Sequence, residues 1–320
     1  MEIKKNDKFT VTIEDMGEDG AGIGRVDGYI WFVKDALIGD TIEASAMKMK
    51  KNYGFARLVR VITPAKGRVE AKCPVARACG GCQLQELDYK EQLKFKEKKV
   101  YNHLKRIGGM ENLFLPEEAD QAAGVPDAVI MEPIIGMEDP WRYRNKAQYP
   151  IGREKDGKPT AGFFAGRTHS LIPVPELDCL LGCGENKDYL AAVLKFMEDF
   201  GVEPYDEANH KGLVRHVLLR KGFASGEHMV CLVINGKKLP HEKEFTERMR
   251  EVGADSISLS FNMEKTNVIL GTEIKNLYGP GYITDKIGNI EYRISPLSFY
   301  QVNPVQTERL YGTALEFADL

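Results

Sequence analysis

The first sixty residues alternate between apolar and polar positions in short runs that are separated by turns. Residues 8–13 alternate as a strand does, the glycine-rich residues 17–24 supply turns, and residues 29–33, 40–44 and 55–62 are predicted as further short strands. Several short strands joined by such turns are typical of a small closed barrel of the OB type. The pattern predicts this barrel over residues 1–64, with Thr63-Pro64 as its boundary.

A helical pattern follows over residues 89–107 and is closed by Gly108-Gly109. Residues 111–127 have the composition of a polar connection. The remaining pattern predicts an α+β domain with a largely antiparallel sheet, so that residues 65–294 form a central domain. The predicted strands are 147–151, 162–165, 213–220, 229–234, 256–261 and 267–270, and the predicted helices are 185–200 and 241–252.

The last stretch reads as a lead-in, 298–304, followed by a helix over 307–318. No C-cap glycine follows this helix, which indicates a chain cut short within a third domain that begins at 295.

Composition narrows the class of protein. With 320 residues, 43% apolar and 28% charged, the chain has the size and balance of a globular protein of two or three domains. No run approaches the roughly 18 apolar residues of a membrane-spanning helix, and the polar N-terminus lacks a signal-peptide core. We therefore expect a cytoplasmic protein with reduced cysteines and no membrane partner. A net charge of −3 excludes a uniformly basic nucleic-acid binder but not a local basic face.

Three of the six cysteines, Cys73, Cys79 and Cys82, lie within ten residues and suggest a metal centre. Gly80 and Gly81 let the backbone turn tightly and point amide N–H groups at sulfur. A disulfide framework does not suit the expected compartment, and a redox Cys-x-x-Cys pair normally opens a helix in a βαβ unit. Structural zinc usually takes two paired arms, of which only one is present here. Both zinc and an iron–sulfur cluster stay open on spacing alone.

A fourth ligand would come from elsewhere in the chain. Cys179 is the natural candidate for an iron–sulfur cluster, and Cys183 is its competitor. Cys231 lies in an apolar strand and is interpreted as a core thiol.

Two groups of residues are candidate RNA contacts. Basic and aromatic side chains that alternate along a strand end can pair with phosphates and stack on bases. His216 is interpreted as a satisfied strand histidine and not as a catalyst. The lysines of the helix over 89–107 are interpreted as a solvated face. The two candidate groups are Lys48, Lys50, Lys51, Tyr53 and Arg57, and Arg142, Arg144 and Lys146.

These residues and their order resemble the RNA (uracil-5-)-methyltransferases, and more closely the branch that acts on 23S ribosomal RNA. The resemblance covers essentially the whole chain, with the barrel as the family's TRAM domain. It is carried by Tyr143-Arg-Asn-Lys-Ala-Gln148, Gly212-Leu-Val-Arg-His216, Thr266-Asn-Val-Ile-Leu-Gly271 and Ser295-Pro-Leu-Ser-Phe-Tyr-Gln-Val-Asn-Pro304.

The resemblance implies a [4Fe-4S] cluster on Cys73, Cys79, Cys82 and Cys179, and a contact between Gln301 and S-adenosylmethionine. It implies an enzyme of rRNA processing that makes 5-methyluridine, in which a cysteine adds to uracil C6 before the methyl group moves to C5. We expect a monomer that binds 23S rRNA. The alternatives are a tRNA uracil-5 methyltransferase and a non-catalytic iron–sulfur RNA-binding module.

The family's α/β Rossmann-like methyltransferase domain, with the catalytic cysteine and base, is expected to be absent apart from its lead-in. The expected fold class is accordingly an OB-like TRAM β-barrel followed by an α+β central domain with a cysteine-ligated cluster, and the chain alone is expected to be inactive.

Overall fold

The computed structural model describes residues 3–166 and 168–319, which form two compact units. The first unit comprises the chain up to Lys72 together with Cys82–Glu138, and the second comprises Cys73–Gly81 together with the chain from Asp139. The short segment Cys73–Gly81 is therefore packed with a different unit from the residues on either side of it. The division of the chain into domains 1–64, 65–294 and 295–320 stays a prediction from the sequence.

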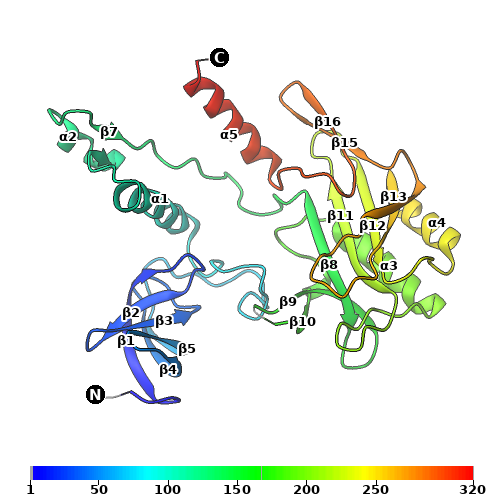
Figure 1. Ribbon diagram of the computed structural model, residues 1–320, viewed down its shortest axis with the longest axis horizontal. Coiled ribbons are helices and arrows are strands. Elements are labelled where there is room, and N and C mark those ends of the chain that lie inside the picture. The colour runs from blue at the N-terminus through cyan, green and yellow to red at the C-terminus, as the bar shows by residue number, and fades with distance from the viewer. Residues whose placement is uncertain (1–2, 167, 320) are drawn as a thin grey trace. The chain divides into compact units, whose positions relative to one another are not determined.

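The first unit contains the predicted barrel, closed in the strand order β1-β2-β3-β5-β4 (Figure 1). All neighbours are antiparallel except β3 and β5, which run parallel. Trp31, Val33 and Ile42 fill the interior, and each is at most 1% exposed. The strands are β1 Lys8–Met16, β2 Gly22–Val26, β3 Tyr29–Lys34, β4 Thr41–Met49 and β5 Tyr53–Thr63.

Strand β2 lies partly where glycines predicted only turns. An added Cβ would lie 2.6 Å from the Ala36 carbonyl oxygen at Gly22, and 2.4 Å from the Thr12 carbonyl oxygen at Gly24. These glycines are therefore required by the close approach of neighbouring backbones and do not end the strand.

A buried ion pair fastens the barrel to the residues after β5. The Asp40 carboxylate is fully buried and accepts hydrogen bonds from the backbone N–H groups of Leu37 and Ala65, each at 2.8 Å. It also pairs with Arg68 at 2.7 Å, and Arg68 pairs in turn with Glu86 at 2.5 Å. Asp40 thus holds two turns and a neighbouring segment through one carboxylate.

Helix α1, Tyr89–Arg106, follows in the same unit and agrees with its predicted bounds almost to the residue. The side chain of Asp88 caps it by accepting the Lys90 N–H at 3.0 Å. Phe95 of α1 packs beside Met16 and Leu37. The predicted polar connection contains short elements: β6 Leu113–Phe114, η1 Pro116–Glu118, α2 Ala119–Ala122 and β7 Val129–Ile130.

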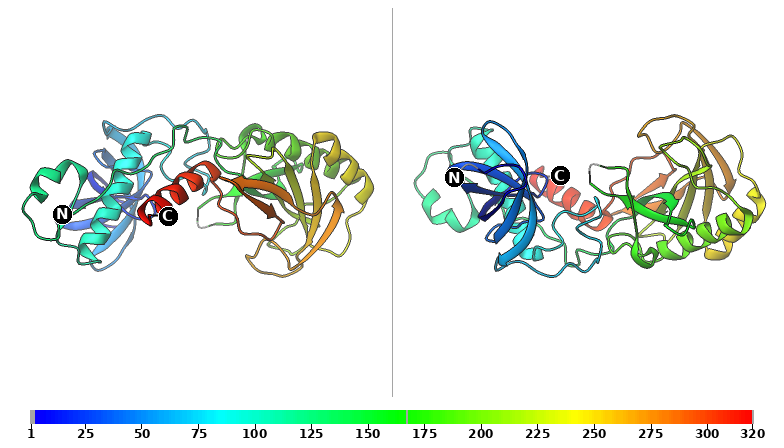
Figure 2. Two further views of the ribbon diagram at one scale, coloured as in Figure 1. Left: turned by 90° about the horizontal axis from the view of Figure 1, so that it is seen from above. Right: turned by 90° about the horizontal axis from the view of Figure 1, so that it is seen from below.

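The second unit is built on a seven-stranded sheet of order β10-β9-β8-β11-β12-β13-β14. Among the described strands of this sheet only β12 and β13 are parallel neighbours, so the predicted largely antiparallel α+β arrangement is present. Helices α3 and α4 lie on one side of the sheet (Figure 2), where their residues share a core with it. The elements are β8 Lys146–Arg153, β9 Pro159–Phe164, β10 Leu171–Pro173, η2 Pro175–Leu177, α3 Asn186–Phe200, β11 Val214–Lys221, β12 His228–Ile234, α4 Glu242–Val252, β13 Ser256–Phe261 and β14 Glu273–Tyr278.

The strand predicted at 267–270 is wrong, because these residues form an irregular loop. The Asn262 side chain donates to the carbonyls of Val268 and Ile269 at 2.6 and 2.9 Å, and Arg215 donates to the Thr266 carbonyl at 3.3 Å. Side chains therefore satisfy carbonyls that a strand would pair with backbone N–H groups.

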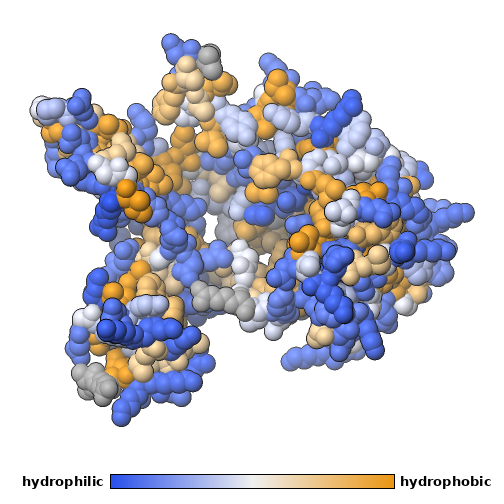
Figure 3. All heavy atoms as spheres, in the orientation of Figure 1, coloured by the Kyte–Doolittle hydropathy of each residue, from blue (hydrophilic) through white to orange (hydrophobic). Residues whose placement is uncertain are grey.

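The other side of the sheet carries a hairpin of β15, Ile283–Ile287, and β16, Ile290–Ile294, followed by α5, Pro304–Phe317. Ile283, Ile294 and Tyr300 pack with Met229 of the sheet. Helix α5 leaves Leu310, Leu315 and other apolar side chains exposed. Figure 3 shows apolar residues, in orange and tan, along the part of the surface that this helix forms. No helix among the described residues combines the length and apolar character needed to cross a membrane.

Candidate nucleic-acid interface

The first predicted group of RNA contacts lies around the turn between β4 and β5. The Lys50 N–H donates to the Tyr53 carbonyl at 2.8 Å, which closes the turn. The Tyr29 hydroxyl donates to the Lys50 carbonyl at 2.8 Å and holds the turn against β3. Lys48, Lys50, Lys51, Tyr53 and Arg57 are all exposed, so the barrel presents their charges together at one place.

No ion pair joins Lys48, Lys50, Lys51 or Arg57 to a carboxylate among the described residues. Their charges are therefore not neutralised locally. A surface of this kind attracts a polyanion and gives binding that weakens with added salt. The first predicted group thus has the exposure and charge that an RNA contact requires.

Arg142, in the second predicted group, is engaged inside its own unit. Its guanidinium meets Asp178 through two hydrogen bonds, at 2.5 and 2.7 Å, and also donates to the Cys179 carbonyl at 3.1 Å. The Asp178 bond raises the pKa of Arg142 against the opposing effect of partial burial. Because this guanidinium anchors the loop that carries Cys179, we leave Arg142 out of the proposed RNA contacts.

Arg144 and Lys146 lie beside a buried cation, Arg220. Lys146 and Arg220 are paired in register on β8 and β11, so their side chains share a face of the sheet. Burial lowers the pKa of Lys146, and the charges of Arg220 and Arg144 lower it further. No carboxylate among the described residues pairs with Arg220, so this end of the sheet has a local positive potential.

Arg220 and Asn145 hold the segment that carries Gln301. Arg220 donates to the Ser298 carbonyl at 2.5 Å, and Asn145 donates to the Gln301 carbonyl at 2.8 Å. The Asn145 N–H also donates to the Val302 carbonyl at 2.9 Å. The Gln301 side-chain amide makes no hydrogen bond to another described residue, so its backbone is fixed while the amide is left for another partner.

The cysteine segment is bound to the second unit. The Gly80 N–H donates to the Phe164 carbonyl at 3.0 Å, and Cys79 pairs with Ala165 in a β-bridge. A Cβ at position 80 would lie 2.6 Å from the Phe164 oxygen, so only glycine fits. As predicted, a glycine amide points at sulfur, since the Gly81 N–H donates to Cys79 Sγ at 3.3 Å.

The described residues do not assemble a metal centre around the predicted ligands. Cys73, Cys79, Cys82 and Cys179 are all partly exposed. Across residues 3–166 and 168–319, no three His, Cys, Asp or Glu side chains come together as a group that could hold a metal ion. The geometry therefore does not support the predicted cluster, and no chemical step is derived through one.

Cys183 and Cys231 are buried thiols. Cys183 Sγ donates to the Arg144 carbonyl at 3.4 Å. Burial raises the pKa of each thiol to about 11, so both are protonated at neutral pH. A protonated, inaccessible thiol is a poor nucleophile and a poor metal ligand, which makes Cys183 the weaker competitor to Cys179.

His216 lies on β11, as the sequence interpretation places it, but the structure does not give this buried ring the satisfied hydrogen bonds that the interpretation expected. It is 6% exposed, and its Nδ1 has no hydrogen-bond partner among the described residues. Burial lowers its pKa to about 4, and the Arg215 charge adds to the effect.

This pKa predicts an acid-sensitive fold. Between the unfolded value near 6.5 and about 4, the unfolded chain binds a proton at this site that the folded chain does not. The free energy of unfolding is therefore expected to fall by up to about 3 kcal/mol as the pH drops through this range. Urea unfolding at several pH values will show it. His216→Met should flatten this part of the profile, whereas the exposed control His210→Asn should not; a flat profile for the unaltered chain would contradict the prediction.

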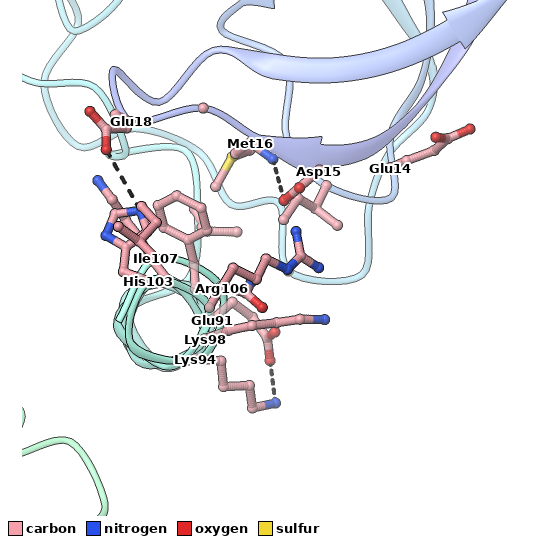
Figure 4. A pocket seen from close by; sticks show the side chains of 17 residues that line it. Glu14, Asp15, Met16, Glu18, Glu91, Lys94, Lys98, His103, Arg106 and Ile107 are labelled. Atoms are coloured by element: carbon pink, nitrogen blue, oxygen red, sulfur yellow. Dashed lines mark hydrogen bonds and ion pairs between the residues drawn. The ribbon is translucent and has the colours of Figure 1, made fainter. Parts of the chain in front are cut away.

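A cavity of about 600 Å³ lies within the first unit, between α1 and the end of β1 (Figure 4). Lys94, Lys98 and Arg106 come from the helix, Glu14 comes from β1, and Glu18 comes from the turn that follows β1. Lys94 and Lys98, expected on a solvated face, therefore line a cavity. Because both signs of charge line it, the cavity has no uniform attraction for phosphate.

Comparisons with known proteins bear on this interface. Residues 4–59, the barrel, match the TRAM domain family. Over 320 residues the chain is 44% identical to an uncharacterized RNA methyltransferase of Halalkalibacterium halodurans, covering 99% of this chain and 66% of the relative. A relative of the same description from Clostridium tetani is 43% identical, with 99% and 65% covered.

The chain is related to the RNA methyltransferases. It spans about two thirds of the length of the curated relatives that it matches. Its fold is similar to the crystal structure of the tRNA (uracil-54, C5)-methyltransferase of Pyrococcus abyssi in complex with S-adenosyl-L-homocysteine. The TM-score is 0.71 at 24% identity, over 96% of this chain and 64% of that one.

These matches correct the expected fold class. The methyltransferase domain is expected from the sequence to be absent apart from its lead-in, but 99% of this chain aligns with an RNA methyltransferase and 96% with a solved one. The match therefore runs through the barrel, the sheet and the C-terminal hairpin and helix, and the expected absence is overturned. The expectation that the catalytic cysteine and base lie elsewhere has no support from these matches.

Two aromatic residues of the barrel surface are not among the RNA contacts predicted from the sequence. Phe32 and Phe55 contact Tyr53, which the sequence did indicate. Phe32 lies on β3, and only the parallel pairing of β3 with β5 brings it there. The available signal for Phe32 was the run of aromatic and aliphatic residues at 29–33.

Proposed function

We propose that the protein carrying this chain is an S-adenosylmethionine-dependent RNA (uracil-5-)-methyltransferase that forms 5-methyluridine. The observation that carries the proposal is the 44% identity to an RNA methyltransferase over 320 residues. The exposed basic turn of the TRAM barrel supplies a surface suited to RNA phosphates.

The proposed reaction activates uracil before the methyl group moves. A cysteine thiolate adds to C6, and the resulting enolate attacks the sulfonium methyl group through C5, releasing S-adenosylhomocysteine. A base then removes the C5 proton, and elimination across C5–C6 releases the thiolate and restores the uracil ring. The uracil must leave its stack to react, so the protein needs RNA contacts around the reactive base. In this chain we assign that role to the turn between β4 and β5, and to Arg144 and Lys146.

The test is methyl transfer from methyl-labelled S-adenosylmethionine to RNA, with 5-methyluridine detected after hydrolysis. The proposed substrate is 23S ribosomal RNA. Transfer RNA is the alternative, because the solved structure with a similar fold, at a TM-score of 0.71, is that of a tRNA methyltransferase. Both RNAs are offered separately to the whole protein. Label in 23S RNA supports the proposed substrate, label only in transfer RNA replaces it, and label in neither overturns the proposed activity.

Gln301 is proposed to contact S-adenosylmethionine. Two observations support the proposal: Asn145 donates to the Gln301 backbone carbonyl, and the Gln301 side-chain amide makes no hydrogen bond to another described residue. We expect Gln301→Ala to raise the KM for S-adenosylmethionine about 3- to 10-fold through the loss of one hydrogen bond. Steady-state kinetics at saturating RNA measure this effect.

Asn289→Ala, which removes an exposed amide from the turn between β15 and β16, is the matched control and should leave this KM unchanged. An unaltered KM in Gln301→Ala would remove Gln301 from the proposed cofactor site.

An iron–sulfur cluster on Cys73, Cys79, Cys82 and Cys179 stays a separate proposal. It rests on the spacing of the cysteines and on amide donors at two sulfurs, including Gln85 Nε2 at 3.1 Å from Cys82 Sγ. Anaerobic purification followed by assays for iron, sulfide and zinc tests it. A colourless, zinc-loaded protein would overturn the cluster without affecting the proposed methyl transfer.

A further inference from the structure

The outer surface of the barrel carries three aromatic rings in mutual contact. Phe32 lies 5.7 Å from both Tyr53 and Phe55 between ring centroids, and Tyr53 lies 5.7 Å from Phe55. Tyr53 meets the other two edge to face, at 85° and 84°. We call Phe32, Tyr53 and Phe55 the aromatic trio.

Strand geometry places the trio outside the barrel. Trp31 and Val33 point into the interior, so Phe32 between them points outward. On β5, Gly54 faces the interior, because a Cβ at this position would lie 2.6 Å from the Trp31 ring. Its neighbours Tyr53 and Phe55 therefore share the outer face, where Phe32 is opposite Phe55 in register.

The trio contributes little to the interior of the barrel. None of its members is part of the apolar cluster that the described barrel residues form around Trp31. Tyr53 is 39% exposed, and Phe32 and Phe55 are partly exposed. Three aromatic rings gathered on a surface without supporting the core are typical of a binding surface.

Cations surround the trio. Lys48 is paired with Phe55 across β4 and β5, and Arg57 follows Phe55 on the same face of β5. Lys50 and Lys51 occupy the adjacent turn. These cations form no favourable contacts with an apolar protein partner. A nucleic-acid strand, in contrast, has aromatic bases that stack on the rings and phosphates that pair with the cations.

We propose that the aromatic trio is a stacking platform for unpaired bases of the RNA substrate, an inference that rests on the proposed function. Bases stack on the exposed ring faces while the phosphates that link them lie along the lysines. Bases inside a duplex cannot reach the rings, so the platform selects single-stranded segments. Stacking accepts every base, which makes this surface a general grip on unpaired RNA beside the base that reacts.

The test measures binding of a fluorescent single-stranded oligouridine of about 12 nucleotides and of a duplex of the same strand length. Phe32→Leu and Phe55→Leu keep apolar side chains but remove the aromatic faces. We expect each to weaken single-strand binding about 10- to 100-fold, with an unchanged salt dependence and little effect on duplex binding. Val59→Leu, on the same face of β5, is the matched control and should bind normally.

A second reporter guards against a folding defect. An oligonucleotide containing 2-aminopurine loses fluorescence when its base stacks on a ring, so quenching should occur with the unaltered chain and disappear in the variants. Unchanged affinity and quenching in both folded variants, or an equal loss of duplex binding, would overturn the platform. The assay contains no S-adenosylmethionine, so its failure is distinguishable from failure of the proposed methyl transfer.

Discussion

Replacing Asp40 with alanine is expected to lower the free energy of unfolding by about 3–5 kcal/mol, since it leaves a largely buried Arg68 without its main partner. The change also removes the acceptor of two backbone N–H groups, those of Leu37 and Ala65. Urea unfolding at neutral pH, followed by circular dichroism, measures the loss.

The control is Glu43→Ala, which removes a partly exposed ion pair with Arg60. That change should cost at most about 1 kcal/mol. A cost for Asp40→Ala no larger than that of Glu43→Ala would contradict the role assigned to the buried pair.

The same carboxylate adds acid sensitivity at low pH. Burial alone would raise the pKa of Asp40, but the Arg68 hydrogen bond and the Ala65 and Leu37 N–H groups outweigh burial and lower it. A lowered folded pKa means stability that is fully present above about pH 4 and is lost as the pH falls through the folded value.

Neutralising the four cations of the β4–β5 region should weaken RNA binding by roughly 100- to 1,000-fold at about 100 mM salt. The variant carries glutamine at Lys48, Lys50, Lys51 and Arg57. Each lost phosphate contact lowers the slope of log affinity against log salt by about 0.7 for a single strand, so the slope should fall by about 3. Fluorescence anisotropy over a salt series measures both quantities.

A second fourfold variant gives the matched control. Changing Lys90, Lys94, Lys96 and Lys98 of α1 to glutamine removes the same net charge from exposed helix positions. Binding should change little. If the helix variant loses as much affinity and slope as the barrel variant, RNA binding is a response to net charge and the barrel surface has no special part in it.

The elements that the sequence predicted best are those whose signals are local. Helix α1 carries its own cap at Asp88, and α3 and α4 end at Gly201 and Gly253, both with positive φ. Apolar spacing and such end signals act within a few residues, so they are legible without the rest of the fold.

The sequence predicted strands wrongly where residues far away in the chain determine the local backbone structure. Glycines at 22 and 24 indicate turns when taken alone, and only the backbones of neighbouring segments explain why they lie in β2. The apolar run at 267–270 is typical of a strand, yet the side chain of Asn262 takes its carbonyls. The hairpin of β15 and β16 was missed, although Gly288-Asn289 between apolar residues is a recognisable turn signal.

The residues of the candidate site also differ in whether local sequence or the fold brings them together. The basic residues and Tyr53 lie within ten positions of one another and could be found together. Phe32 lies 21 positions before Tyr53 (53 − 32), and joins it through the pairing of β3 with β5, which are neighbours in the barrel but not consecutive along the chain. Arg142 matched the sequence pattern of an RNA contact, but the presence of Asp178 in reach of its guanidinium could not be read from spacing.

The packing of Cys73–Gly81 with the second unit has a consequence for synthesis on the ribosome. Gly80 precedes its partner Phe164 by 84 positions (164 − 80), so the cysteine segment emerges long before β9 exists to receive it. The barrel can close while that segment is still solvated and its thiols are open to oxidation. The rate of translation through β9 therefore sets how long these thiols stay fully solvated before packing leaves them only partly exposed, and slowing it should increase their oxidation in the nascent chain.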